Sequence, residues 1–506
     1  MIFIILPVFA TSGKLKILVF SKTAEFRHKS IPKGIETFRY LARENNWDID
    51  FSEDASRFDS TLFKYDVLVF LNTTGDILND SQQEVLKDFV GRGKGFVGVH
   101  AASDTEKKWS WYSDMIGAVF SHHPKIQQAA LKTANLYKPF FGKDFKERQT
   151  QDEWYNFKEA VAPYVNVLTY LDETSYTGGE MKGNHPITWF HHFDGGRVFY
   201  TGLGHVDAQY DDANFLNELT IAVKWAGGLI NDPMPPKKFT NLLTDNLNDH
   251  WSVFIGAPHA SVKGLPNVDP NSNGKNADPL GLNSDPKHVF SLEKQGNENV
   301  LHISGEIYGA LTSKLEYQNY HLKVQFKWGD KIWPPREGDP KDNGILYHCV
   351  GAYRSFWNVW MQSQEFQIQR HDFGDYFALA GTKATIALTT APDGKNLIYQ
   401  KGAQKTDISG RFKRPFNTAK RGFDNEKPQG EWNTIELYCI ADKSVYVVNG
   451  KVVMFLEDLQ QFNKDGSVIP SQKGLFQIQS EAAEAYYKNV EIESIDKLPK
   501  SIKKQL

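Results

Sequence analysis

The hydrophobic pattern of this sequence changes at one proline-rich segment, Ile230 to Lys238, which reads INDPMPPKK. Before this segment, short apolar runs alternate with amphipathic stretches, a pattern typical of parallel strands covered by helices. After it, short β-rich runs follow one another with turn residues between them, which indicates an antiparallel sandwich. Proline removes a backbone donor and stops a helix, so the segment marks a domain boundary. A length of 506 residues also favours two large domains.

We therefore expect an α/β domain over residues 14–228, a linker over 229–238 and an all-β domain over 239–495. The strands predicted in the first domain are Lys16–Phe20, Tyr65–Leu71, Gly95–Val99, Val165–Tyr170, Ile187–Phe190 and Arg197–Thr201, with helices at Ser30–Asn45 and Asn79–Gly91. The strands predicted in the second are Tyr320–Trp328, Trp432–Ile440, Ser444–Asn449 and Gly474–Gln479, with a hairpin turn at Asn449-Gly450. Two long polar loops, Pro258–Pro286 and Trp333–Asp342, are expected to wall a site or to lie in the domain interface.

Charge and composition exclude some partners and indicate a compartment. The 58 Lys and Arg residues against 61 Asp and Glu leave a net charge of -3, which gives no electrostatic footprint for nucleic acid. The apolar run at residues 2–10 resembles the end of a signal peptide, so we expect a periplasmic or secreted protein, with the cytoplasm as the alternative. No later stretch approaches the ~20 apolar residues of a membrane helix. The two cysteines, Cys349 and Cys439, are expected to be buried thiols.

The segment GFVGVHAASD, residues 95–104, predicts a buried strand that turns sharply among small residues. In α/β enzymes such an elbow raises one side chain above the sheet, and here that side chain is His100. An elbow built around serine or cysteine would predict acyl transfer, whereas imidazole carries protons or binds metal ions. The sequence therefore predicts an imidazole site without a nucleophile.

Two further histidines, His28 and His205, also follow predicted strands of the same sheet. Because ligands gather at the carboxyl ends of parallel strands, we expect His28, His100 and His205 to share one pocket, with His185 on its rim. These imidazoles would bind a sugar or a metal ion, or move protons; the alternative is that each satisfies nearby backbone groups. The pairs His122-His123 and His191-His192 are expected at the surface or in an interface.

Four motifs of the first domain resemble one known family. They are FRHKSI from Phe26, GVHAASD from Gly98, HPITWF from His185 and GRVFYTGLGH from Gly196 to His205. In this order they resemble the ThuA-like (trehalose utilisation) family, a branch of the class I glutamine amidotransferase-like fold. The resemblance implies a flavodoxin-like parallel sheet and a sugar-related pocket, without the cysteine of amidotransferases.

Five blocks of the second domain resemble another family. They include NGILYHCVG from Asn343, EFQIQRHDFGDYF from Glu365 and GLFQIQSEAAEAYYKNVEI from Gly474. Together they resemble the 3-keto-disaccharide hydrolase family, whose fold is similar to a concanavalin-like jelly roll (β-sandwich). The segment Pro258–Pro286 is a long insertion relative to simpler members, so it changes the rim of the implied site.

The strands of the second domain carry polar residues at alternate positions. Glu365 and Gln367 share one face of a strand, and Gln479 and Glu481 share one face of another. Polar groups on a cupped sheet favour a binding surface, although a solvated outer face gives the same pattern. We expect catalysis and binding by the following residues: Glu365 and His371 as base and acid in either order, Lys314 near the developing oxyanion, and Gln367, Tyr347, Glu481 and Gln479 on sugar hydroxyls or a divalent ion.

The two resemblances together predict a carbohydrate-active enzyme that cleaves 3-keto-glycosides. The C3 ketone acidifies the hydrogen on C2, so a base, an oxyanion-stabilising group and an acid suffice for β-elimination and subsequent hydration. The sequence leaves the cofactor open and is compatible with a divalent metal ion. It carries no nicotinamide or flavin fingerprint, so a separate sugar 3-dehydrogenase is implied as partner. The alternative is an exported lectin-like protein that binds glycans without cleaving them.

Overall fold

The computed structural model describes residues 14–134, 140, 147–233, 238–463 and 466–506. The chain divides into two compact units between Ile230 and Asn231. The apolar run at residues 2–10, expected to end a signal peptide, lies outside the described residues, as do linker residues 234–237. Within the described residues, none of the helices combines the length and apolarity needed to cross a lipid bilayer.

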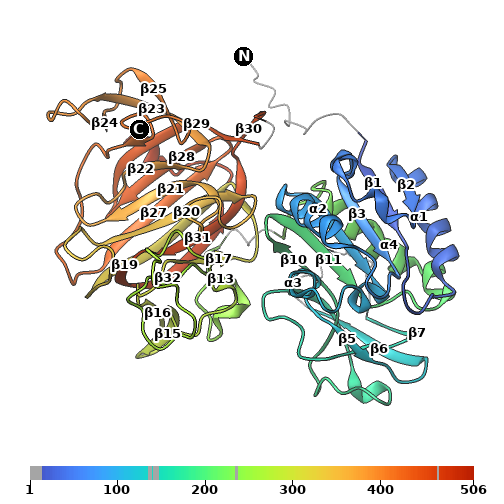
Figure 1. Cartoon of the computed structure of the whole chain (residues 1–506). Coiled ribbons are helices and arrows are strands. Elements are labelled where there is room, and N and C mark those ends of the chain that lie inside the picture. The colour runs from blue at the N-terminus through green and yellow to red at the C-terminus, as the bar shows by residue number, and fades with distance from the viewer. Residues whose placement is uncertain (1–13, 135–139, 141–146, 234–237, 464–465) are drawn as a thin grey trace. The chain divides into compact units, whose positions relative to one another are not determined.

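The N-terminal unit is built on one mixed sheet with the strand order β2-β1-β3-β4-β11-β10-β9-β6-β7, and helices lie on both faces of its parallel strands (Figure 1). The strands are β1 (Lys16–Phe20), β2 (Asp48–Ser52), β3 (Val67–Leu71), β4 (Gly95–Val99), β5 (Phe120–His122), β6 (Gln127–Thr133), β7 (Arg148–Asp152), β8 (Asn156–Phe157), β9 (Asn166–Leu171), β10 (His185–Phe193) and β11 (Gly196–Thr201). The helices are α1 (Ile31–Asn45), α2 (Asp80–Gly91), α3 (Ser110–Ile116) and α4 (Ala213–Ala226).

Local sequence explains where these elements begin and end. β3 and β4 are apolar runs buried over their whole length, as strands covered on both faces must be. Asn79 and Gln82 form a capping box that starts α2. α1 ends at Asn45, and the left-handed backbone of Asn46 caps it. The strands and helices predicted here are thus present, with ends that differ by at most three residues.

The sequence pattern predicts a parallel sheet, but only part of the observed sheet is parallel. β2, β1, β3, β4 and β11 pair in parallel, but β10, β9, β6 and β7 continue the sheet as antiparallel strands. Two of these, β6 and β7, were not predicted, because they carry mixed polar residues and only part of each is buried. This extension matters for function because β7 ends at Asp152, directly before Glu153.

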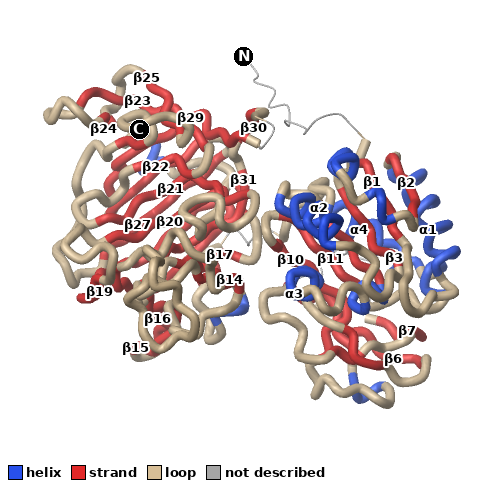
Figure 2. The backbone as a smooth tube through the Cα atoms, viewed as in Figure 1, coloured by secondary structure: helices blue, strands red, loops and turns tan. Residues whose placement is uncertain are grey.

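The C-terminal unit is a sandwich of two antiparallel sheets, and Figure 2 shows that strands dominate it. The first sheet holds β12 (Thr240–Asn241), β15 (Phe290–Gln295), β16 (Glu298–Ile303), β19 (Tyr320–Ile332), β23 (Thr382–Thr390), β24 (Leu397–Tyr399), β25 (Lys405–Ser409), β27 (Asn433–Ile440), β28 (Lys443–Val448), β29 (Lys451–Phe462), β30 (Val468–Pro470) and β32 (Ala483–Ser494). The second holds β13 (Trp251–Ile255), β14 (Gly281–Leu282), β17 (Gly309–Ser313), β18 (Tyr317–Gln318), β20 (Asp342–Val350), β21 (Gln362–Gln369), β22 (Tyr376–Leu379), β26 (Thr418–Ala419) and β31 (Lys473–Ser480). A short helix, α5 (Lys500–Lys503), follows β32.

The core of this unit lies between the two sheets. Phe366 of β21 stacks on Tyr446 of β28 with ring centroids 4.3 Å apart, and Ile478 of β31 is buried in the same cluster. Alternation along each strand therefore turns the neighbours of Phe366 and Ile478 to the outer face of the second sheet. The predicted hairpin at Asn449 and Gly450 joins β28 to β29, and both residues have positive φ.

Limited proteolysis should release two stable fragments that meet near residues 229–238. Each unit has its own buried core, so each is expected to stay folded when the connection is cut. Mass spectrometry of the fragments and their separate unfolding curves measure this. Rapid degradation of either half to small peptides would contradict the division.

Candidate functional site

Three histidines meet at the carboxyl ends of the parallel strands in the N-terminal unit. His28 follows β1, His100 follows β4 directly and His205 follows β11. The ring of His28 lies with its centroid 5.0 Å from the rings of both His100 and His205, and these two are 5.3 Å apart. The structure thus brings together the three imidazoles that the sequence placed at equivalent strand ends.

The backbone at the elbow fixes how His100 is presented. His100 has a φ of 49°, a left-handed conformation, and starts a 3-10 turn through Asp104 whose residues are all buried. Its Nδ1 lies 2.8 Å from the carbonyl oxygen of Gly202. A carbonyl only accepts hydrogen bonds, so Nδ1 carries the proton, and in the neutral ring Nε2 presents a lone pair.

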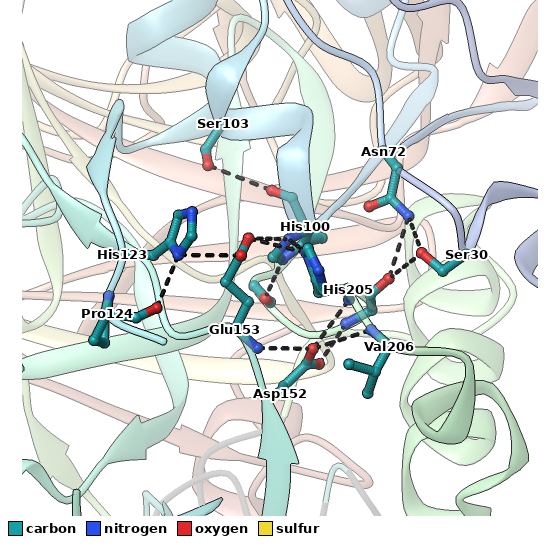
Figure 3. Close-up of polar contacts among 12 residues, drawn as sticks. Ser30, Asn72, His100, Ser103, His123, Pro124, Asp152, Glu153, His205 and Val206 are labelled. Carbon is teal, nitrogen blue, oxygen red and sulfur yellow. Dashed lines mark hydrogen bonds and ion pairs between the residues drawn. The ribbon is translucent and has the colours of Figure 1, made fainter. Parts of the chain in front are cut away.

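A carboxylate that the sequence analysis missed, Glu153, completes the cluster (Figure 3). Its Oε2 lies 2.9 Å from Nδ1 of His205 and 3.4 Å from Nε2 of His100. Burial favours the protonated form, but hydrogen bonds and charge interactions with His100 and His205 outweigh it and hold the pKa of Glu153 well below its usual range. The carboxylate is therefore ionised.

The neighbouring residue Asp152 joins the segments that carry these groups. Its fully buried carboxylate accepts hydrogen bonds from the backbone amides of Glu153, Gly204, His205 and Val206 at 2.8–3.3 Å (Figure 3). One side chain thus ties the end of β7 to the segment after β11. Asp152 positions Glu153 and His205 relative to each other.

His28 is the least satisfied member of the cluster. It is only 3% exposed, and its Nδ1 has no hydrogen-bond partner among the described residues. Burial, and then the charges of His100 and His205, lower the pKa of His28 to about 2, so the ring is neutral. One ligand atom from each of His28, His100, Glu153 and His205 lies within 4.8 Å of the others, so this group can hold a metal ion.

The remaining histidines lie elsewhere or differ from expectation. His185 is fully buried outside this group, where Nε2 contacts the carbonyl of Tyr155 at 2.8 Å and Nδ1 contacts the hydroxyl of Tyr176 at 2.9 Å. It therefore fixes the segment that follows Glu153. The two histidine pairs were expected at the surface or in an interface, and this is wrong for His191, which is 1% exposed. His123 is exposed, but its Nδ1 also lies 3.1 Å from Oε1 of Glu153.

The outer face of the second sheet in the C-terminal unit carries a second polar cluster, here called the Glu365 face. It consists of Asp342, Glu365, Gln367, Gln479 and Glu481, contributed by β20, β21 and the end of β31. Glu365 and Gln479 are hydrogen-bonded and lie over Gly344 of β20. A Cβ at Gly344 would lie 2.3 Å from Oε1 of Gln479 and 2.7 Å from Oε1 of Glu365, so only glycine leaves room for both.

Burial raises the pKa of three carboxyls on this face. Glu365 is 4% exposed, and burial, reinforced by the charge of Asp342, raises the pKa of its carboxyl well above the usual range. Burial likewise raises the pKa of Glu481 and brings that of Asp342 to about 6. Carboxyls whose pKa is raised by burial are stronger bases when ionised than ordinary surface carboxylates, which favours a role in general acid and base catalysis.

Two cations balance these carboxyls, and both come from the long polar loops. Arg336 forms ion pairs of 2.6 Å with Asp342 and with Glu481. Lys275 lies with its Nζ 3.1 Å from the ring centroid of the partly exposed Trp357, and burial lowers its pKa. The sequence marked the loops but missed these residues, because nothing in a polar loop shows which side chain turns inward.

The three other residues predicted for this site lie apart from Glu365. Tyr347 points into the sandwich core, where its hydroxyl bonds Ser444, so placing it on the polar face is wrong. Lys314 follows β17, which is separated from β21 by the two strands β31 and β20, and burial lowers the pKa of Lys314 to about 7. His371 is exposed, and its backbone amide donates to Glu426. The expected convergence of Glu365, His371 and Lys314 does not occur.

Comparisons with known proteins agree with this division. Residues 16–226 match the family model described as trehalose utilisation (ThuA), and residues 272–493 match the 3-keto-alpha-glucoside-1,2-lyase-like domain. No curated protein matches the chain.

Solved structures resemble the two units at low identity. A protein of Bacteroides uniformis described as ThuA-like is 21% identical over 44% of this chain and 95% of its own, with a TM-score of 0.38. A protein of Parabacteroides distasonis described as a glycosyl hydrolase is 18% identical over 51% of this chain and 100% of its own, with a TM-score of 0.27. A carbohydrate-binding module of Bacillus subtilis is 11% identical over 40% of this chain and 92% of its own, with a TM-score of 0.24.

Proposed function

From the premise that this chain joins a ThuA domain to a 3-keto-alpha-glucoside-1,2-lyase-like domain, we propose that its C-terminal unit cleaves 3-keto-glycosides. The two domain families make the chain a carbohydrate-active protein of the glycoside hydrolase or lyase type. The finer proposal is supported by one observation: a buried carboxyl of raised pKa, Glu365, lies on a polar face with the guanidinium of Arg336 close by.

The reaction needs few groups, and the Glu365 face supplies them. A base removes the C2 proton, and the electron pair of the broken C2–H bond forms the enolate of the C3 ketone. The enolate then re-forms the ketone, with a double bond between C1 and C2, as the bond between C1 and its oxygen breaks. The departing oxygen takes a proton, and water added to the resulting enone gives the free 3-keto sugar. Glu365 acts as the base, because a raised pKa makes a carboxylate a stronger base. Arg336 stabilises the enolate oxygen electrostatically.

The other residues of the face complete the proposal. Glu365 returns the proton that it has taken from C2 to the departing oxygen, and Gln367 and Gln479 bind sugar hydroxyls. Lys314 and His371 have no part in it. The ketone must first be made by a separate sugar 3-dehydrogenase, and the ThuA unit processes a sugar of the same class.

The decisive experiment incubates the full chain with 3-keto-trehalose and 3-keto-lactose and with their unoxidised parents. Sugar release is expected only from the keto compounds, because only the ketone makes the C2 proton removable. Equal release from the parents would contradict elimination. Binding of all four sugars without release would instead establish the lectin-like alternative.

On the acid side, the rate of cleavage should begin to fall at a higher pH than it would with a glutamate base of ordinary pKa. The base must be ionised to remove the proton, so activity falls as the pH drops through the pKa of Glu365, which burial raises well above 4.5. A kcat/KM profile on a 3-keto-glycoside measures this fall. A rate that stays constant down to pH 4.5 would contradict Glu365 as the base.

Replacing Gly344 with alanine should reduce activity while leaving the fold intact. The added Cβ would meet the ends of the Gln479 and Glu365 side chains, which can move aside without unfolding the sheet. We expect a loss of at least about tenfold in kcat, because misplacing a catalytic group by ~1 Å is costly. A melting temperature near wild type serves as the control, and unchanged kcat would show that the positions of these two side chains do not matter.

A further inference from the structure

We propose that His28, His100, His205 and Glu153 bind one divalent first-row transition-metal ion of the zinc class, which keeps a coordination position for an oxygen ligand. The donor set supports this choice of ion. Three imidazoles and one carboxylate suit Zn²⁺, Co²⁺, Fe²⁺ or Ni²⁺, whereas Mg²⁺ and Ca²⁺ prefer oxygen ligands alone. The four ligand atoms already lie within 4.8 Å of one another.

The distances within the cluster match a coordination shell. Nδ1 of His205 lies 2.9 Å from Oε2 of Glu153, and Nε2 of His100 lies 3.3 Å from Nδ1 of His205 and 3.4 Å from Oε2 of Glu153. An ion about 2.0–2.1 Å from each ligand separates tetrahedral ligands by about 3.3 Å and adjacent octahedral ligands by about 2.9 Å. These three atoms therefore form a triangle of the size that one ion requires.

The hydrogen-bonding of His100 also favours a cation between these groups. Its Nδ1 contacts the carbonyl oxygen of Gly202, so its other nitrogen, Nε2, is the atom that faces Oε2 of Glu153 and Nδ1 of His205. A metal ion satisfies all of these atoms at once.

The ligands are held from outside, as metal ligands usually are. The Gly202 carbonyl orients His100, and His123 contacts the second carboxylate oxygen of Glu153. Asp152 fixes the backbone of Glu153 and of His205. Such outer contacts set ligand orientation and strengthen metal binding.

The surface around the cluster favours a sugar oxygen as the fifth ligand, an inference that rests on the proposed function. Four protein ligands leave a first-row ion room for an oxygen ligand. His205 is 18% exposed, so solvent reaches this side, and the ring of Phe26, which is 61% exposed, lies 4.9 Å from that of His28. An exposed aromatic ring beside a metal ion suits a sugar ring, and the neighbouring carbonyl and hydroxyl of a 3-keto sugar supply the oxygen.

The test uses the full chain, stripped of metal with a chelator and titrated with Co²⁺, whose visible d–d bands report imidazole coordination. We expect uptake of about one equivalent and competition by Zn²⁺. His28→Ala and Glu153→Gln should weaken Co²⁺ binding by at least about 10- to 100-fold. His122→Ala removes a half-exposed imidazole outside the group and should bind as the wild type does.

Two results would overturn the metal site: no stoichiometric uptake by the wild type, or equal affinity in Glu153→Gln and His122→Ala. Adding 3-keto-glucose should change the Co²⁺ bands, whereas glucose should not, and unchanged bands would overturn the sugar-oxygen ligand. Glu365→Gln is expected to bind Co²⁺ normally while losing glycoside cleavage, so failure of the metal site and failure of the proposed function are distinguishable.

Discussion

Glu365→Gln is expected to lower kcat on a 3-keto-glycoside by about 100-fold or more, the usual loss when a general base is removed. The amide keeps the size of the carboxyl and can still bond Gln479, but it cannot accept the C2 proton. Steady-state kinetics on 3-keto-trehalose measure the loss. KM should change little, because the interaction lost is one made in the transition state.

The matched control is Glu431→Gln, which neutralises an exposed glutamate. It should leave kcat unchanged. If Glu365→Gln turns over normally while His371→Ala is inactive, the exposed histidine is the base, and the burial of Glu365 serves another purpose. If both retain full activity, the reaction does not use this face.

Asp152→Ala is expected to destabilise the N-terminal unit by about 3 kcal/mol or more. The substitution removes the acceptor of four backbone hydrogen bonds at a fully buried site, and each buried amide left without a partner costs about 1–3 kcal/mol. It also separates the segment after β11 from the end of β7. Urea unfolding of the full chain, followed by probes in each unit, measures the change.

Asp207→Ala is the matched control, because this exposed aspartate lies two residues after His205. It should change the free energy of unfolding by less than about 0.5 kcal/mol. An Asp152→Ala protein as stable as this control would show that water replaces the lost acceptor. The unfolding transition of the C-terminal unit should be the same in both variants.

Several structural features were predictable from the sequence because they depend on local patterns. The apolar runs and capping residues predicted the parallel strands and α1 and α2, and the prolines near residue 233 marked the division. Strand order then explains why His28, His100 and His205 converge, since parallel strands end at one edge. Period-two alternation likewise placed Glu365 and Gln367 on one face.

Other features were settled only by the tertiary structure, because they depend on contacts between distant segments. Glu153 joins the histidines through an antiparallel extension whose polar strands carry weak signals, and Arg336 reaches Asp342 and Glu481 from an irregular loop. Period-two alternation along a strand predicts which residues share a face, but it does not predict which of the two faces packs against the core. The sequence by itself therefore determined the domains, the histidine edge and the polar stripe, whereas the packing of the two sheets put Tyr347 in the core and Glu365 outside it.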